Sequence, residues 1–437
     1  MNEKLGVART VLGMTPDHPS VPDAKTSKGC YRPIRLTQFD GATGVIPPEA
    51  RTIYARCGTR HETKCASCAE VYRRDAITLI EKGVPKRRRK GHHLLFVTLT
   101  APGAKYFGSA NHRRTGQFTG ACPCGVPHSP DDEILGAPLD FDKFDYDLAV
   151  RWNLSLPELW RRFLIALERE FPTQRIEYVK VVEVQRRGLF HIHAIVRIEP
   201  TKSGIVITDR ELIKAGVVAA SKIPDVGGHK FGKQVDVKFA RQSPPKKRKN
   251  ENDADYQKRV RQAMTRNTFA RYLAKYATKG ADHSLRKGGV GKYVVAHQMK
   301  LKKAAEPYAK EWELERKKEW REEQLALPRE LRASVIMKKR ALLIYETRAN
   351  SMVQSFGFSG QFLTKSSKYS TTFKKLREKV REVARQKAAE IFGKDFDKFD
   401  WMVIGFGLFK EHEEYVANFW KDNLKIRGYE PPIFMSV

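Results

Sequence analysis

This chain of 437 residues has no long apolar run, only six cysteines, and far fewer acidic than basic side chains. The 50 Asp and Glu are outnumbered by 82 Lys and Arg, which leaves a formal net charge of +32 and a pI near 9.9. Such a surplus is the electrostatic footprint of a protein that binds a polyanion, as nucleic-acid-binding, ribosome-associated and membrane-surface proteins do. The charge therefore predicts the class of partner, and other features must supply the activity.

The lack of long apolar runs argues against a membrane-spanning helix. No run approaches the roughly 20 residues that crossing a bilayer takes, and the N-terminal Met-Asn-Glu-Lys has no apolar stretch typical of a signal peptide. We therefore expect a cytoplasmic protein with no membrane partner. In that setting the six cysteines favour metal ligands or free thiols over a disulfide framework.

The chain is long enough, and at 41% hydrophobic residues apolar enough, for two or three packed domains. It shows no internal repeat. We expect a cysteine-rich N-terminal region at residues 1–90, a central domain at 91–295 and a basic C-terminal domain at 296–437. A long inserted loop at 101–150 carries cysteines and a histidine within the central domain.

The central segment reads as alternating strands and helices. We expect a buried strand at 93–100, an amphipathic helix with Pro157 near its first turn, a tight hairpin of strands at 176–184 and 189–198, and a strand at 233–239. A further helix begins around residue 254 or later. This order predicts an α+β fold, with an antiparallel sheet and helices on one face.

The hairpin carries the first candidate site, in the sequence Phe-His-Ile-His at residues 190–193. The alternation of a strand puts His191 and His193 on one face, and a three-residue loop centred on Arg187 sets Glu183 directly across from His191. One carboxylate and two imidazoles suit Mg²⁺ or Mn²⁺ with positions left open for phosphate oxygens. The alternative is two histidines on the polar face of a half-exposed strand.

Two phenols four residues apart, Tyr272 and Tyr276, lie on one face of the later helix. A phenol with a pKa of about 10 is a weak nucleophile at neutral pH unless a cation assists it. Lys275 and Lys279 each follow a tyrosine by one helical turn and offer such a cation. Ordinary core packing of the two rings is the alternative.

The cysteines form two clusters. Cys65-x-x-Cys68 with Cys57 upstream looks like a zinc knuckle that lacks one ligand, and Cys30 is the candidate for the fourth. Buried free thiols are the alternative. In the inserted loop, Cys122, Cys124 and His128 form a second, weaker candidate zinc site, named here without its fourth ligand.

Together these motifs resemble the HUH endonucleases, a superfamily named for two histidines that flank a hydrophobic residue. In detail the chain is similar to the RepSA-like replication initiators of actinobacterial rolling-circle plasmids. The matching motifs are Phe-Val-Thr-Leu-Thr at 96–100, Glu183 with Phe-His-Ile-His-Ala at 190–194, and Tyr-Leu-Ala-Lys-Tyr-Ala-Thr-Lys at 272–279. Similar stretches, including the cysteine region and Gly-Phe-Ser-Gly-Gln-Phe at 357–362, extend the resemblance over most of the chain.

The resemblance implies a fold, a reaction and partners. The fold would be the HUH core, a ferredoxin-like split βαβ sheet, with a zinc-binding N-terminal region and a C-terminal DNA-binding or helper domain. Tyr276 would nick one strand at a plasmid origin and stay linked to the 5′ phosphate. Tyr272 takes the place where relatives carry a second tyrosine or a glutamate. The partners would be double-stranded and single-stranded origin DNA, a host helicase and the polymerase machinery of a bacterial cytoplasm.

One departure concerns the second zinc site: many relatives carry a Cys-x-x-Cys pair where this chain has Asp-Phe-Asp-Lys at 140–143. Three other functions remain. A conjugative relaxase usually carries its tyrosine ahead of the histidine motif, and a compact transposase is much shorter. A zinc-stabilised DNA-binding regulator without enzymatic activity would leave Glu183, the two histidines and Tyr276 unexplained.

Overall fold

The computed structural model describes residues 30, 33–39, 52–62, 65–85, 89–116, 120–240, 246–249, 251–262, 266–277, 291–328, 335–378, 382, 386 and 400–406. Its contacts divide the chain into two compact units, residues 1–79 with 371–437 and residues 80–370. This division differs from the three consecutive segments expected above, because a C-terminal strand pairs with an N-terminal one. No described helix combines the length and apolar character that crossing a bilayer requires.

The first unit contains a three-stranded antiparallel sheet in the order β2-β1-β8. These strands are β1 (Ile34–Phe39), β2 (Thr52–Ala55) and β8 (Asp400–Phe406). The unit also contains the short α10 (Phe373–Leu376) and most of α2 (Ala66–Lys82), whose Tyr72 ring stacks on Phe373 at 5.2 Å. Cys57 follows β2, and Cys65 and Cys68 stand at the start of α2, so the cysteine region joins the sheet to this helix.

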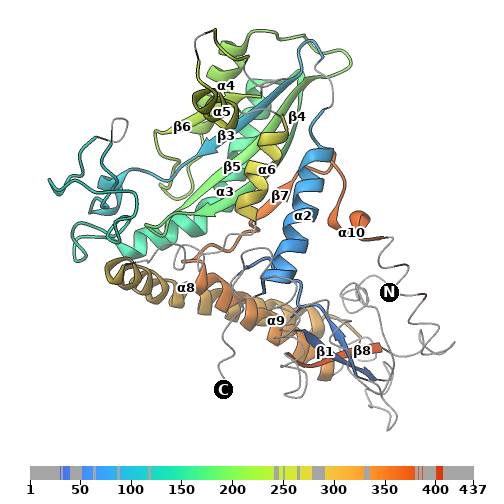
Figure 1. Cartoon of the computed structure of the whole chain (residues 1–437). Helices are drawn as coiled ribbons and strands as arrows, with labels where there is room; N and C mark the ends of the chain where they lie inside the picture. The colour runs from blue at the N-terminus through green and yellow to red at the C-terminus, as the bar shows by residue number, and fades with distance from the viewer. Residues whose placement is uncertain are drawn as a thin grey trace. The chain divides into compact units, whose positions relative to one another are not determined.

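The second unit is built on a five-stranded antiparallel sheet in the order β6-β3-β5-β4-β7 (Figure 1). The strands are β3 (His93–Leu99), β4 (Gln174–Val184), β5 (Phe190–Pro200), β6 (Val235–Phe239) and β7 (Leu363–Lys365). With α3 between β3 and β4 and α4 between β5 and β6, the chain order β-α-β-β-α-β is that of a split βαβ arrangement. The expected antiparallel α+β architecture is confirmed.

Two helices cover one face of this sheet, α3 (Tyr146–Glu170) and α4 (Arg210–Lys222). Apolar side chains of β3, β5 and β4 on that face, such as Val97, Ile192 and Val182, are buried against α3 in the main core. The side chain of Asp145 caps the first turn of α3 by accepting from the backbone N–H of Leu148. The helix therefore starts eleven residues before Pro157, and the expectation that Pro157 marks the first turn was wrong.

The opposite face of the sheet is covered by α6 (Arg266–Ala277), which contacts β4 and β5 (Figure 1). Its Leu273 and Ala274 are fully buried. The expectation that helices lie on one face was thus incomplete, because alternation along the strands also leaves apolar side chains such as Phe96 and Val181 on this second face. The remaining helices of the unit are η1 (Ala104–Phe107), α5 (Asp253–Gln262), α8 (Lys292–Leu325) and α9 (Val335–Gln354).

Side chains of two helices, α3 and α8, hydrogen-bond to the β4–β5 turn. The three-residue loop at 186–188 is closed by a hydrogen bond from the backbone N–H of Gln185 to the carbonyl of Leu189 (2.8 Å), and Gly188 takes the positive φ of 76° that this turn needs. Each of the three loop carbonyls has a side-chain partner. The contacts are Gln298 Nε2 to Arg186 O (3.3 Å), His297 Nε2 to Arg187 O (3.1 Å) and Asn153 Nδ2 to Gly188 O (3.0 Å).

Replacing Asn153 is expected to destabilise this turn strongly. Its amide is fully buried and donates to the carbonyls of Gly188 (3.0 Å) and Phe356 (2.9 Å). Asn153→Ala would leave both carbonyls unpaired, so we expect the free energy of unfolding to fall by about 2–4 kcal/mol. Chemical denaturation measures the loss, and Ser155→Ala on the exposed side of the same helix should stay within about 0.5 kcal/mol of the parent. Equal stability of the two variants would contradict the anchoring role.

Candidate active site and metal centres

The β4–β5 hairpin aligns Glu183 and the two histidines on one face. Glu183 lies directly opposite His191 in the register, as the sequence predicts, and His193 follows two residues along the same strand. The imidazole rings of His191 and His193 lie nearly parallel, with centroids 6.0 Å apart. His193 Nε2 lies 3.0 Å from Glu183 Oε2, so the imidazole donates a hydrogen bond to the carboxylate.

Thr98, which the sequence reasoning did not single out, fixes the other side of His193. Its Oγ1 lies 3.1 Å from His193 Nδ1, and the two residues are paired across β3 and β5. With Nε2 donating to Glu183, Nδ1 accepts from the threonine hydroxyl in the neutral imidazole. The hydroxyl can also accept, so Thr98 can hold His193 in either tautomer. The alternating pattern of the first motif, 96–100, already places Thr98 on this face.

His191 is held in its neutral form. Burial lowers its pKa to about 3, with smaller contributions from His193 and from the positive charge of Arg187. Its Nδ1 is buried with no hydrogen-bond partner among the described residues. A neutral imidazole with an unsatisfied nitrogen is the form that binds metals.

The tyrosine helix brings both phenols onto the histidine face. The Tyr276 ring stacks on the His193 ring with centroids 4.8 Å apart, and the Tyr272 ring lies edge-on to His193 at 6.2 Å. The two phenol rings are 5.1 Å apart, and Tyr272 also meets Phe96 at 5.4 Å. The tyrosine pair and the histidine pair, about 80 residues apart in sequence, therefore form one site.

The hydroxyl of Tyr276 is kept protonated. Burial, followed by a hydrogen bond with Tyr272 and the nearby charge of Glu183, raises its pKa well above the ordinary value. The side chain is only 8% exposed. Such a phenol needs a positive charge beside it before it becomes a nucleophile.

The positions of the two predicted lysine side chains lie outside what the structure describes. Lys279 lies outside the described residues, and of Lys275 only the helical backbone is described. The sequence reasoning missed another cation, Arg187 in the hairpin turn, whose charge acts on His191. Its guanidinium donates to the carbonyl of Pro102 (3.1 Å) and to Gln185 Oε1 (2.8 Å). Burial lowers its pKa to about 10, which still leaves it charged at neutral pH.

The residues of this site fit a divalent cation in donor type. Two neighbouring ligands of an octahedral ion with bonds of about 2.1 Å lie about 3.0 Å apart, which is the separation of His193 Nε2 and Glu183 Oε2. The ligand atoms of Glu183, His191 and His193 are not all gathered within 4.8 Å, unlike those of two other groups among the described residues. His191 would have to approach the other two to complete the set, and its unpartnered Nδ1 shows that no hydrogen bond at that atom opposes this movement.

The first of those two groups is Cys30, Cys57, Cys65 and Cys68, the four cysteines expected to bind zinc. Cys30 and Cys65 are fully buried, and their sulfur atoms lie 3.9 Å apart. Sulfur ligands of one tetrahedral zinc are separated by about 3.8 Å. The backbone N–H of Cys57 donates to Cys30 Sγ (3.4 Å), which favours a thiolate. The candidate fourth ligand, Cys30, is thus brought to the other three.

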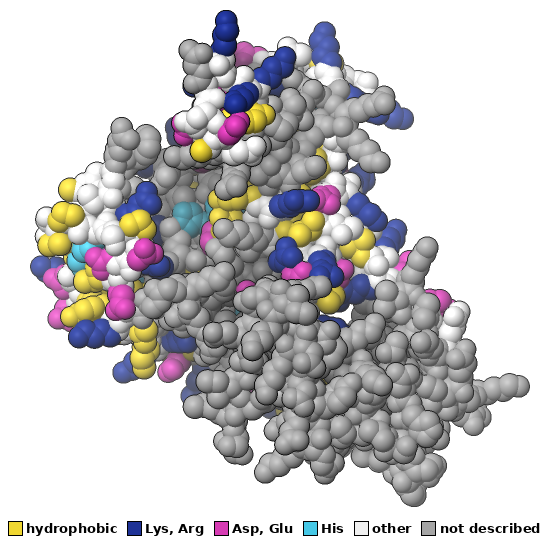
Figure 2. Space-filling model, in the orientation of Figure 1, with side chains coloured by type: hydrophobic (Ala, Val, Ile, Leu, Met, Phe, Trp, Pro, Cys, Tyr) yellow, Lys and Arg dark blue, Asp and Glu magenta, His cyan; other side chains and the backbone are white. Residues whose placement is uncertain are grey.

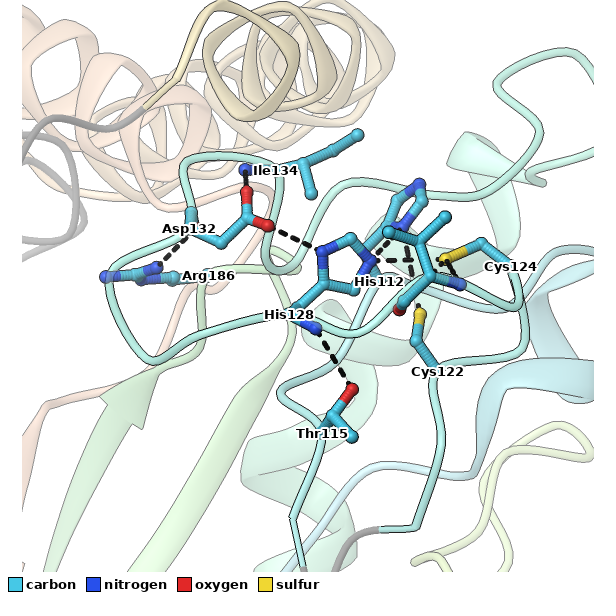
Figure 3. A network of polar contacts seen from close by, with 9 residues as sticks. His112, Thr115, Cys122, Cys124, His128, Asp132, Ile134 and Arg186 are labelled. Carbon is cyan, nitrogen blue, oxygen red and sulfur yellow. Dashed lines mark hydrogen bonds and ion pairs between the residues drawn. The ribbon is translucent and has the colours of Figure 1, made fainter.

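The second group is His112, Cys122, Cys124 and His128, all in the inserted loop (Figure 3). The sequence reasoning found Cys122, Cys124 and His128 and missed His112. The signal was a histidine ten residues before Cys122 in the same loop, which would have completed a set of two cysteines and two histidines.

Comparisons with known proteins agree with the resemblance of the motifs. The sequence model of the family RepSA, described as the replication initiator protein of pSAM2, matches residues 21–422. A replication initiator protein of Streptomyces ambofaciens is 29% identical over 372 residues, which cover 77% of this chain and 71% of the relative. No solved structure matches. The matched span includes both cysteine groups, the histidine hairpin and the tyrosine helix.

Proposed function

This chain belongs to the RepSA family of replication initiator proteins, and from that premise we propose that it starts rolling-circle plasmid replication as an HUH endonuclease. It would nick one DNA strand at the double-strand origin, stay joined to the 5′ phosphate through tyrosine, and later rejoin the strand. The observation that carries the proposal is the stacking of Tyr276 on His193 at 4.8 Å, where His193 also bonds Glu183.

The element order of the second unit supports this assignment. The histidine hairpin occupies the two strands β4 and β5 inside the sheet, and the tyrosine helix crosses the same face later in the chain. Histidines on central strands are held rigidly, whereas α6 follows residues 241–265 and belongs to a separate part of the chain. The site thus combines a fixed ligand set with a nucleophile brought by another element.

The proposed reaction is a phosphodiester exchange. The Tyr276 Oη attacks phosphorus, the bond from phosphorus to the 3′ oxygen breaks, and that oxygen leaves with a proton as a 3′ hydroxyl. The proton lost by the tyrosine balances the one gained by the 3′ oxygen, exchanged through solvent, and no oxidant or reductant is involved. Because one phosphodiester replaces another, the linked strand can be rejoined by the reverse attack of a 3′ hydroxyl.

The side chains of the site would prepare the strand and the phenol for this exchange. Glu183, His191 and His193 would hold Mg²⁺ or Mn²⁺, which polarises a phosphate and favours the tyrosinate when bound. With Nε2 bound to the ion, Nδ1 of His193 would carry the proton and donate to Thr98 Oγ1, which would hold His193 in the tautomer that the ligand set requires. Arg187, whose charge acts on His191, would contribute a second positive charge near the phosphate.

Origin DNA is the proposed substrate, and the surface charge supports it. On the face shown in Figure 2, the described Lys and Arg side chains are interspersed with other types and not gathered in one patch. In the second unit a cavity of about 510 Å³ is lined by Lys82, Arg89, His92, Arg175, Arg197 and Glu199. Dispersed cations bind the phosphate backbone without reading sequence. The 3′ hydroxyl left by nicking would serve the host polymerase, with a host helicase opening the duplex.

A direct test is to incubate the full chain with supercoiled plasmid carrying the origin, with Mg²⁺, with Mn²⁺ and with a chelator. We expect a relaxed plasmid and a covalent protein–DNA adduct only when the divalent ion is present. Binding without any adduct under all three conditions would leave the DNA-binding regulator as the better assignment.

For the first cysteine group we propose a structural zinc ion. Cys65→Ala is expected to remove that zinc and to lower the stability of the first unit, because the metal contributes to its folding free energy. Metal analysis and thermal unfolding of the purified variant give both quantities. A zinc-free parent protein that unfolds at the same temperature as the variant would contradict the proposal.

A further inference from the structure

We propose that His112, Cys122, Cys124 and His128 bind a second zinc ion, and that this ion braces the turn of the histidine hairpin through the inserted loop. The inference does not depend on nicking. It concerns how the part of the inserted loop that precedes α3, residues 101–145, is held and what it supports.

The four side chains already stand at tetrahedral ligand distances. The ring nitrogens His112 Nδ1 and His128 Nε2 lie 3.3 Å apart, and two nitrogen ligands of one zinc are separated by about 3.3 Å. Cys122 Sγ lies 3.8 Å from His112 Nδ1, and Cys124 Sγ lies 3.1 Å from His128 Nε2, around the value of about 3.6 Å for nitrogen and sulfur ligands. All four ligand atoms lie within 4.8 Å of one another.

The surroundings are those of a metal site. The far nitrogen of His128, Nδ1, donates to Asp132 Oδ2 at 2.6 Å, which turns the lone pair of Nε2 toward the other three ligands (Figure 3). Asp132 is itself held by the backbone N–H of Ile134 (3.1 Å). The backbone N–H of Val126 donates to Cys124 Sγ (3.4 Å), as is expected for a thiolate.

Two connections lead from these ligands to the hairpin turn. The backbone of His112 is bonded to Ala137 O (2.8 Å) and to the N–H of Gly136 (2.9 Å). Gly136, at φ +96°, lies so close to the turn that an added Cβ would be 2.5 Å from the Cβ of Arg186. The second connection runs through Asp132, whose backbone carbonyl lies 3.5 Å from Arg186 Nη1 (Figure 3).

The inserted loop therefore contacts the β4–β5 turn, whose backbone carbonyls are hydrogen-bonded to side chains of α3 and α8. The described part of this loop contains no helix or strand beyond η1, so hydrogen bonds between its turns and any bound ion determine how it is held. A zinc ion would fix His112 and His128 relative to each other, and with them Gly136 and Asp132. The ion would thereby hold the turn that sets Glu183 opposite His191.

The zinc content of the full chain tests the site. We expect two zinc equivalents in the parent, one in His112→Ala, and two again in His112→Cys, which keeps a ligand at that position. A zinc content that is the same in His112→Ala as in the parent would overturn the site. Should His112→Ala not fold, the zinc contents of the parent and of His112→Cys still decide. Each can reach two equivalents only if the loop site binds one of them.

A matched pair of aspartates tests the orienting role of Asp132. In competition with a chromophoric chelator, Asp132→Ala is expected to weaken binding of one of the two zinc ions by about 10–100-fold. Asp131→Ala, one residue away and exposed, should bind both as the parent does. Equal affinities in the two variants would remove Asp132 from the site.

Hydrogen exchange tests the brace. The amides of Gln185 and Gly188 close the turn by bonding Leu189 O and Gln185 O. In His112→Ala these amides should exchange at least about tenfold faster than in the parent, while peptides of α2 around Cys68 exchange at the parent rate. Loss of one zinc with unchanged exchange at 185–189 would overturn the brace, whatever the variant does to DNA.

Discussion

Tyr276→Phe is expected to form no covalent adduct with origin DNA. The change removes one oxygen and keeps the ring that stacks on His193 at 4.8 Å, so fold and packing should survive. Loss of an attacking nucleophile typically costs about 10³-fold or more in the chemical step. The measurement is adduct formation with a labelled origin oligonucleotide, at divalent ion concentrations that saturate the parent protein.

Tyr272→Phe is the matched control on the same helical face. Its ring packs on Phe96, and its hydroxyl is in contact with Tyr276. We expect this variant to nick and join an oligonucleotide and to fail in plasmid replication, because closing a completed round needs a second acceptor for the displaced strand. Peptide sequencing of the labelled adduct separates the two roles. DNA on Tyr272 after the first cut would reverse the assignment, and DNA on neither tyrosine would end the covalent mechanism.

The register of the β4–β5 hairpin could be predicted from local sequence rules alone. The alternation of a strand and the length of a tight loop are both short-range properties, and they sufficed to place Glu183 opposite His191. The same rules predicted four of the five strands of the second unit to within about two residues and missed the short edge strand β7. The helical spacing of Tyr272 and Tyr276 likewise predicted that they share a face.

The features that these local rules missed depend on contacts between residues far apart in the sequence. Nothing local to α6 says that it covers the sheet face opposite α3, because both faces of the central strands carry apolar residues. Pro157 looked like a helix start, but the helix already runs from Tyr146, capped by Asp145, and continues through the proline. His112 and His128 are separated by an irregular segment without the periodicity of a helix or a strand. Their rings come together only in the folded loop.

Glu183→Gln is expected to slow metal-dependent nicking severely while binding to duplex origin DNA stays close to that of the parent. The change keeps the shape of the side chain and removes the negative charge that a divalent ion requires, while the amide oxygen can still accept the hydrogen bond from His193 Nε2. We expect nicking slower by roughly 10²–10³-fold, with His191→Ala and His193→Ala behaving alike. DNA affinity should survive because it rests on dispersed Lys and Arg contacts.

The control for this prediction is Glu177→Gln, six residues earlier on the same face of β4, where the carboxylate accepts from Ser366 Oγ (2.6 Å). Removing that charge alters a buried carboxylate on the same strand without touching the site, so nicking should stay within a few-fold of the parent. Nicking rates measured across a titration of Mn²⁺ show whether Glu183 is a metal ligand. If Glu183 is a ligand, its variant should need far more Mn²⁺ or show no activity, while Glu177→Gln keeps the parent's dependence. Parent-like rates and Mn²⁺ dependence in Glu183→Gln and in both histidine variants would show that the strand is cut without this metal site.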